Sequence, residues 1–262
     1  MSIFPIVVLY NIDLEGSIVY KELLVNCSSY LVYDNSVSPI NKKYANERIH
    51  YHHDSDNGGV SAAYNYGAKV AKELGGVEAI LLLDQDTKFQ PGLIETMERE
   101  LSKYPDVDLF VPQVTYGNNM PFSPILRGLF GKNHILPEGK YSLNQYLPVN
   151  AGACIRLNAF DKVGGYNPNI RLDFADFDFF SRLCEINPHF RVVNISAYQS
   201  FSNDEKNPER LFRRYCMFLE GAKFARKNPL ISRRVVYDVI KHTIALTLRT
   251  KSLKFLKYLI NK

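Results

Sequence analysis

The chain of 262 residues is long enough to bury a substantial core, and a mixed α/β enzyme of this length usually forms one domain with an appendage. Hydrophobic residues make up 46% of the sequence and charged residues 23%, a composition that excludes disordered and fibrous classes. The formal net charge of +5 is too small to indicate a nucleic-acid-binding protein, so no nucleic acid is expected as a partner.

The first half of the chain alternates short β-branched runs with helical patterns. This alternation predicts an α/β fold with a mostly parallel central sheet flanked by helices. The predicted strands are residues 3–10, 30–33, 48–52, 79–83 and 109–112. The helices predicted between them are residues 16–26, 60–74 and 92–103.

Residues 114–148 break the alternation with many glycines and prolines. Long connections of this kind are commonly lids or binding loops. Beyond this segment, the pattern predicts strands at 149–156 and 191–194, and helices at 174–185, 208–227 and 232–259.

Two carboxylates, Asp84 and Asp86, end the apolar strand predicted at 79–83. On an extended backbone, side chains at positions i and i+2 point the same way. At the carboxyl end of a strand, where open α/β sheets bind ligands, such a pair can hold a hard divalent cation and leave room for a diphosphate. An acidic turn or a helix cap is the alternative, because the D-x-D pattern by itself is common.

Polar and aromatic residues also end the first two predicted strands. Tyr10 and Asn11 follow the first strand, and Asp34 follows the second. Asp34 can accept the imide N–H of uracil or thymine, and Tyr10 can stack on the base. Together with the acidic pair they would line one sheet edge for a nucleotide, although a loop cap or a ring at the core edge explains each one singly.

Asn57, Gly58 and Gly59 lead into the helix predicted at 60–74. Glycines allow a ligand to approach closely, and the start of a helix offers free N–H groups. A plain N-cap at Asn57 explains the pattern equally well. Neither G-x-G-x-x-G nor G-x-x-x-x-G-K-[ST] occurs, which argues against a dinucleotide fold and a P-loop.

Acidic residues alternate with aromatic ones from Asp173 through Asp176 to Asp178, and the segment then continues as a helix. Acids in the first turn of a helix suit its dipole, which is the structural interpretation. The functional interpretation is that a carboxylate in an aromatic cleft serves as the general base for an alcohol.

Residues 3–226 resemble the family 2 glycosyltransferases, which share the GT-A fold, a nucleotide-binding α/β domain with a D-x-D metal motif. The resemblance rests on residues 5–11, 32–36 and 57–67, and on the motif at 84–86. It implies that Asp84 and Asp86 hold Mn²⁺ or Mg²⁺. It also implies that the nucleotide sugar is bound by Tyr10, Asn11, Asp34, Asn57, Gly58, Asn65 and Gln85.

Residues 150–153 resemble the acceptor strand of that family, which implies acceptor contacts from Asn150 and Gly152; Asp173 and Asp178 are also predicted to bind the acceptor. The family's catalytic acid pair is commonly Glu-Asp. Residues 175–178 match this pattern, with Ala175 in place of the Glu. The resemblance therefore assigns the base to Asp176, a role that Asp173 or Asp178 could share.

The resemblance implies an inverting transfer from a dTDP- or UDP-sugar to a glycan or lipid-linked glycan in cell-surface polysaccharide synthesis. The Q-x-x-R-W motif of processive synthases is missing, which favours the addition of a single sugar. The D-Q-D form and residues 213–215 look most like rhamnosyltransferase-type members. A nucleotidyltransferase and a degenerate nucleotide-sugar-binding subunit are the alternatives, but residues 10–16 lack the Gly-rich basic loop of the former.

The resemblance divides the chain into a catalytic domain at 1–228 and a helical extension at 229–262. The nucleotide-binding half would be residues 1–113 and the acceptor half 114–228. From 232 to 262 eight Lys or Arg residues accompany an apolar stripe, against the single acid Asp238. This pattern suits an interfacial helix on an anionic membrane surface, or a stripe packed on the catalytic domain or in a homodimer.

The four cysteines are widely spaced and form no C-x-x-C pair, so neither a disulfide framework nor a zinc site is expected. The apolar start lacks a basic n-region and a cleavage site, and no uncharged apolar run is long enough to span a bilayer. A cytoplasmic protein is therefore expected, with a peripheral position on the inner face of the plasma membrane as the variant that the C-terminal pattern allows.

Overall fold

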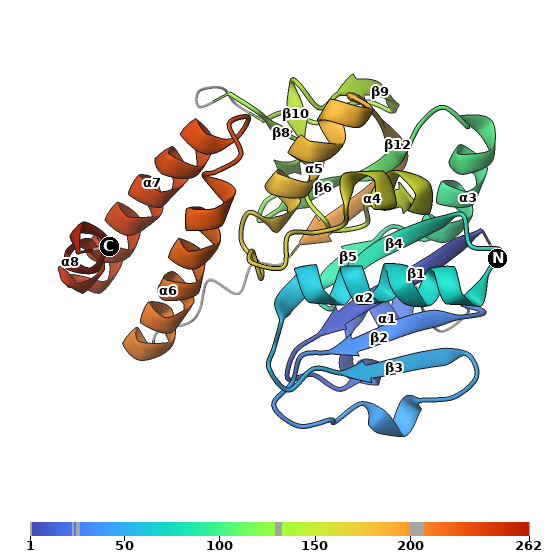
Figure 1. Ribbon diagram of the computed structural model, residues 1–262, viewed down its shortest axis with the longest axis horizontal. Helices are drawn as coiled ribbons and strands as arrows, with labels where there is room; N and C mark the ends of the chain where they lie inside the picture. Colours follow the sequence, from blue (N-terminus) through green and yellow to red (C-terminus); the bar gives the residue numbers. More distant parts are fainter. Residues whose placement is uncertain (1, 23, 25–26, 129–132, 200–206, 262) are drawn as a thin grey trace.

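The computed structural model describes residues 2–22, 24, 27–128, 133–199 and 207–261. A curled sheet lies at the centre of the molecule, and three C-terminal helices project from one side of it (Figure 1). The main path of the sheet runs in the order β3 (Ile49–His53), β2 (Tyr30–Asp34), β1 (Ile3–Leu9), β4 (Ala79–Asp84), β11 (Cys154–Arg156), β6 (Leu109–Tyr116), β12 (His189–Gln199) and β5 (Thr87–Phe89).

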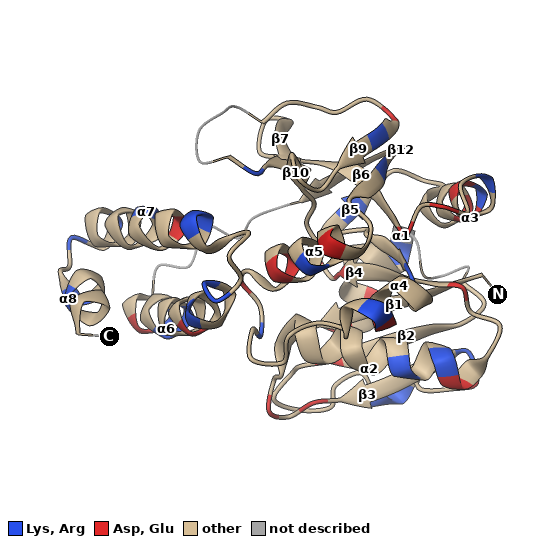
Figure 2. Cartoon of the chain, turned by 45° about the horizontal axis from the view of Figure 1, so that its top comes forward, with Lys and Arg blue, Asp and Glu red and all other residues tan. Residues whose placement is uncertain are grey.

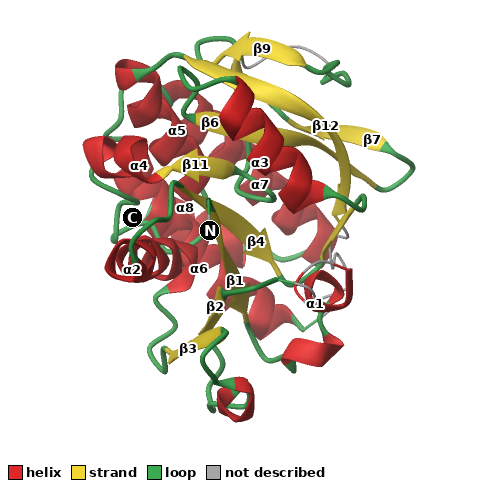
Figure 3. Ribbon diagram, turned by 90° about the vertical axis from the view of Figure 1, so that its right-hand side faces the viewer, coloured by secondary structure: helices red, strands yellow, loops and turns green. Residues whose placement is uncertain are grey.

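The strands β3, β2, β1 and β4 form a parallel half-sheet that is covered on both faces. In Figure 3, α2 (Gly59–Leu74) lies on one side of these strands and α1 (Ile18–Glu22) on the other. The helices α4 (Leu157–Val163) and α5 (Ala175–Ile186) join α2 on its face, whereas α3 (Leu93–Lys103) joins α1. Burial on both faces explains why β1 and β4 are almost continuously apolar instead of alternating.

The other half of the sheet is mixed. Strand β11 runs antiparallel to both β4 and β6, whereas β12 runs parallel to β6 and antiparallel to β5. The predicted parallel arrangement therefore holds up to β4, and the insertion of β11 changes the direction beyond it. Only Cys154–Arg156 of the strand predicted at 149–156 is extended, because the preceding residues turn at Gly152, whose φ is +76°.

Several local predictions differ from the structure. The segment 114–148, predicted as one long connection, contains four short strands, β7 (Met120–Ser123), β8 (Ile125–Leu126), β9 (Gly139–Ser142) and β10 (Tyr146–Leu147). Pro121 lies inside β7 and Gly139 begins β9, so a proline and a glycine of this segment belong to short strands. Of the helix predicted at 16–26, the described α-helical part is only Ile18–Glu22. Helix α4 and strand β5 have no counterpart in the sequence prediction.

The chain ends in three helices, α6 (Pro208–Ala225), α7 (Ser232–Thr250) and α8 (Lys254–Ile260). The helix predicted at 232–259 is broken because Lys251 adopts a left-handed conformation, with φ +50°. Tyr215, Leu219, Leu246 and Phe255 form a small core that joins the three helices. Within the described residues, no helix has both the length and the apolar character needed to cross a bilayer.

Candidate functional site

A cleft of about 810 Å³ opens at the carboxyl ends of β1 and β4. Its walls come from the ends of β1, β4 and β12, the start of α2, residues 149–151 and 172–177, and helices α6 and α7. Parallel strands place their carboxyl ends at the same edge of a sheet, where ligands bind in open α/β folds. The cleft therefore lies where the sequence placed its candidate nucleotide site.

Asp84 and Asp86 lie together in this cleft. The Asp84 Oδ2 accepts hydrogen bonds from the Thr87 Oγ1 at 3.1 Å and from the Gln199 Nε2 at 3.3 Å, whereas its Oδ1 is buried without a partner. Burial, followed by the charge of Asp86, raises the pKa of Asp84 to about 7. A half-buried, like-charged carboxylate pair with an unused oxygen is a site to which a cation would bind favourably.

Gln85 ties the acidic pair to the end of β1. Its Oε1 accepts a hydrogen bond of 2.7 Å from the backbone N–H of Tyr10. The Tyr10 side chain is 49% exposed and lines the cleft, so its ring is available for stacking. Asn11 does not line the cleft; its backbone N–H donates to the Ser36 Oγ.

Asp34 is placed differently from the sequence prediction, because its carboxylate is fully buried and faces its own chain. It accepts hydrogen bonds from the backbone N–H of Ser36, the backbone and side chain of Asn41, and the Tyr51 hydroxyl. These contacts fix the loop that follows β2. In this structure Asp34 therefore presents no carboxylate oxygen to the cleft for a base.

Asp176 lies in the first turn of α5 and lines the cleft. Its Oδ1 accepts a hydrogen bond of 2.8 Å from the backbone N–H of Phe177. Burial raises the pKa of Asp176 to about 7, and the charges of Asp173 and Asp84 add to the increase. A carboxylate with a pKa near neutrality is well matched to proton abstraction from an alcohol.

Asp173 also lines the cleft, but it is not an isolated carboxylate. Both of its oxygens are paired with Arg214 of α6, one of them at 2.8 Å from the Arg214 Nη2. This bidentate pair joins the segment before α5 to the C-terminal helices.

Helices α6 and α7 supply a cationic wall that the sequence did not predict as part of the site. This cationic wall consists of Arg214, Arg234 and Lys241; His242 lies beside it, and burial lowers the pKa of its imidazole. Arg234 is paired with Asp238 at 2.8 Å, and His242 packs against Phe218, with ring centroids 4.7 Å apart. The sequence shows eight basic residues near its C-terminus, but nothing in their spacing indicates that Arg234 and Lys241 face the cleft.

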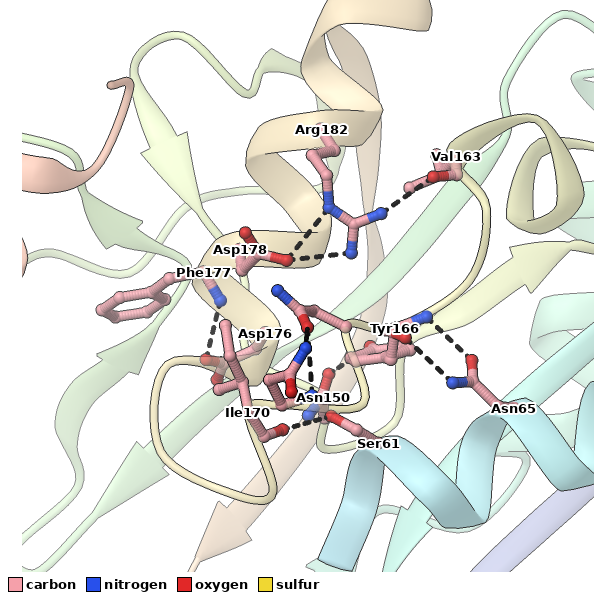
Figure 4. Close-up of polar contacts among 12 residues, drawn as sticks. Ser61, Asn65, Asn150, Val163, Tyr166, Ile170, Asp176, Phe177, Asp178 and Arg182 are labelled. Atoms are coloured by element: carbon pink, nitrogen blue, oxygen red, sulfur yellow. Dashed lines mark hydrogen bonds and ion pairs between the residues drawn. The ribbon is translucent and has the colours of Figure 1, made fainter. Parts of the chain in front are cut away.

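Asp178 and Asn65 are structural in this arrangement (Figure 4). Asp178 is buried and paired with Arg182, whose Nε lies 3.0 Å from the Asp178 Oδ2. Asn65 donates to the carbonyl of Tyr166 at 2.9 Å and accepts from its N–H at 2.8 Å. Neither residue lines the cleft, because the contacts that hold α5 and the 164–166 turn occupy their polar groups.

Asn57 and Gly58 also lie outside the residues that line the cleft. Asp54 holds this turn, because its Oδ2 accepts from the Gly58 N–H and the Tyr33 hydroxyl, both at 2.8 Å. Helix α2 begins after Gly58 without a side-chain cap, so the predicted N-cap at Asn57 is wrong.

Asn150 lines the cleft, and its Oδ1 accepts a hydrogen bond from the Tyr166 hydroxyl (Figure 4). Gly152 lies behind it. A Cβ at Gly152 would lie 2.7 Å from the Phe89 ring, so the glycine lets the chain pass close to that ring. Of the two predicted acceptor residues in this segment, Asn150 thus faces the cleft, whereas Gly152 allows close packing against Phe89.

The family model for glycosyl transferase family 2 matches residues 30–163, just over half of the chain. No curated protein matches the sequence closely enough to be counted as a relative.

Two solved structures illustrate the likeness of fold. GalNAc-T7, crystallised with UDP, GalNAc and Mn²⁺, superposes with a TM-score of 0.52 at 12% identity over 77% of this chain and 44% of that chain. S. aureus TarS in complex with UDP superposes with a TM-score of 0.54 at 16% identity over 87% of this chain and 66% of that chain. This chain thus spans 44% and 66% of the lengths of these two solved chains.

Proposed function

The chain belongs to glycosyl transferase family 2 and has the GT-A fold, and from this premise we propose that it transfers a single sugar from a nucleoside diphosphate to an acceptor hydroxyl with inversion. The observation that carries this proposal is the convergence of Asp84, Asp86 and Asp176 on one cleft. These residues come from two distant parts of the chain, and a metal site and a base are what in-line displacement at an anomeric carbon requires.

The donor would lie along the carboxyl ends of β1 and β4. Tyr10 would stack on the base, and the diphosphate would lie between the acidic pair and the cationic wall. The two solved relatives named above were crystallised with UDP, which supports a nucleoside diphosphate donor. The motif likeness makes dTDP-rhamnose the first donor to test, followed by UDP-sugars.

Asp84 and Asp86 would hold a divalent cation, Mn²⁺ or Mg²⁺. The buried and unpartnered Oδ1 of Asp84 supports this assignment, since a buried acceptor without a donor is unfavourable unless a ligand compensates it. When bound, such a cation stabilises the charge that develops on a departing diphosphate. Among the described residues, no group of three His, Cys, Asp or Glu side chains gathers where it could hold a metal ion.

Asp176 would remove the proton of the acceptor hydroxyl. Its free Oδ2 and its raised pKa support this role, because a base must be ionised yet basic enough to accept the proton. The acceptor would lie against Asn150 and the aromatic residues around Asp176. A glycan or a lipid-linked glycan is the proposed acceptor class.

We further propose that α7 and α8 attach the protein to an anionic membrane surface. Val236, Ile240, Ile244 and Leu248 recur every four residues along α7 and are between 39% and 72% exposed. Figure 2 shows basic residues on the same helices, and acidic residues are few there. An apolar ridge beside cations suits the interface of an anionic bilayer, where a lipid-linked acceptor would be found.

The test is product release from a panel of nucleotide sugars by the wild type and by Asp176→Asn. A transferase releases nucleoside diphosphate and forms a glycoside with inverted configuration, and Asp176→Asn should reduce kcat by about 100-fold to 10,000-fold. Release of pyrophosphate would instead indicate a nucleotidyltransferase. Donor binding without turnover by the wild type would indicate a binding subunit.

A further inference from the structure

Two oxygen atoms beside the acidic pair are buried without a hydrogen-bond donor. One is the Asp84 Oδ1 and the other is the Gln199 Oε1. The same two side chains touch, because the Gln199 Nε2 lies 3.3 Å from the Asp84 Oδ2. Two neighbouring buried acceptors that both lack a donor are rare in a folded protein; they call for a partner that the surrounding side chains do not supply, and a cation is one such partner.

The backbone of Gln199 is positioned by its place in the sheet. It is the last residue of β12, and it lies opposite Thr87 of β5 in the strand register. Thr87 in turn donates to the Asp84 Oδ2 at 3.1 Å. Three strands, β4, β5 and β12, therefore bring Asp84 and Gln199 together at the wall of the cleft.

The Gln199 amide keeps its oxygen available for a cation. Its Nε2 is the donor of the amide group and lies 3.3 Å from the Asp84 Oδ2, so the nitrogen faces the carboxylate. The Gln199 Oε1 is then left without a hydrogen-bond partner, as the Asp84 Oδ1 is. Both atoms are oxygen donors of the kind that Mg²⁺ and Mn²⁺ bind.

We propose that Gln199 supplies a third protein oxygen, its Oε1, to the divalent cation held by Asp84 and Asp86. The inference rests on the cation-dependent function proposed above and adds a ligand to it. The donor set would then contain only oxygen, and this composition favours hard cations such as Mg²⁺ and Mn²⁺ over zinc. A neutral amide also leaves the overall charge of the cation and the acidic pair at zero, so it does not repel a diphosphate.

The experiment measures binding of Mn²⁺ alone by electron paramagnetic resonance, without any substrate. Gln199→Ala should weaken Mn²⁺ binding by tenfold or more, whereas Gln199→Glu, which keeps an oxygen at this position, should retain it. Gln199→His should bind metal with a preference shifted toward Zn²⁺ relative to Mg²⁺, because it replaces an oxygen donor with nitrogen. The matched control is Gln90→Ala, since the Gln90 side chain also bonds β12, through the Ser196 N–H.

The outcomes separate the inference from the proposed function. If Asp84→Asn abolishes Mn²⁺ binding but folded Gln199→Ala binds Mn²⁺ as the wild type does, the cation site stands and the role of Gln199 is wrong. A lower melting temperature of Gln199→Ala with unchanged Mn²⁺ affinity has the same meaning, because it shows a purely structural role. If the wild type binds no Mn²⁺, the cation site and the role of Gln199 fail together.

Discussion

Asp176 is the residue on which the proposed reaction depends most, and its environment predicts how activity varies with pH. Burial raises its pKa from the ordinary value of 3.8 to about 7. A general base acts in its ionised form, so kcat should rise as the pH increases from 6 to 8. The measurement is the pH profile of kcat at saturating donor. A profile that is flat between these values would remove Asp176 as the base.

The same pKa shift predicts how stability varies with pH. Between about pH 4 and pH 7 the native Asp176 binds a proton that the unfolded chain has lost, so the free energy of unfolding decreases as the pH rises to 7. Asp176→Asn has no carboxylate to ionise, so its stability lacks this decrease. In metal-free protein, the melting temperature of the variant relative to the wild type should be higher at pH 8 than at pH 5. The opposite trend would contradict the burial argument.

Asn65 provides a test of donor binding against structure at a single position. Its two hydrogen bonds to the backbone of Tyr166 predict that Asn65→Ala lowers the free energy of unfolding by about 2 kcal/mol. Asn65→Asp should be destabilised as well, because a carboxylate oxygen would then face the Tyr166 carbonyl in place of the amide donor. Denaturant melts and the KM for the donor are measured together. A raised KM with unchanged stability would instead support the contact between Asn65 and the nucleotide sugar that the family resemblance implied.

At the scale of elements, α7 has two different faces. One face packs on α6 through Val235 and Leu246, and the other leaves Ile244 and Leu248 51% and 72% exposed. Replacing both exposed residues with Glu should reduce co-sedimentation with anionic liposomes several-fold at low salt, because charge is then placed in the apolar ridge. Transfer to a water-soluble acceptor should not change, since neither residue lines the cleft.

The control for this experiment is Val37→Glu, which adds the same charge at a side chain that is 78% exposed and lies elsewhere on the molecule. It should bind liposomes as the wild type does. Equal liposome binding by the α7 variant and this control would exclude the ridge as a membrane surface. A change in oligomeric state of the α7 variant alone would indicate a homodimer interface instead.

At the scale of the whole molecule, the C-terminal helices are part of the cleft and not only an appendage. Lys241 and His242 line it together with residues of the N-terminal sheet. Replacing both with Ala should lower kcat/KM for the donor by roughly tenfold to a hundredfold, because two donors to the diphosphate would be lost. Lys251→Ala with Lys257→Ala is the control, since these cations do not line the cleft. If the two double variants lower kcat/KM equally, the cations act by nonspecific electrostatic attraction and not by contact with the diphosphate.

The sequence alone determined the features that depend on short-range geometry. Short β-branched and apolar runs identified most of the strands of the first half, and apolar spacings of three or four identified its helices. The strand before Asp84 placed the two carboxylates at a sheet edge. Asp173 and Asp176 of the acid-aromatic segment also line the cleft. These predictions succeeded because an i, i+2 relation or a strand end carries its geometry within a few residues.

Tertiary structure decided which polar side chains face the cleft. Asp34, Asp178 and Asn65 have the right chemistry, but each is occupied by a partner in the folded chain: Asn41 in the following loop, Arg182 one turn along the same helix, and the backbone of Tyr166. Conversely, Gln199 and the cationic wall reach the cleft from strands and helices far along the chain. The contacts of Gln199 and of the cationic wall with the cleft join residues that are far apart in the sequence. No local periodicity encodes which side of a helix or strand will face the cleft.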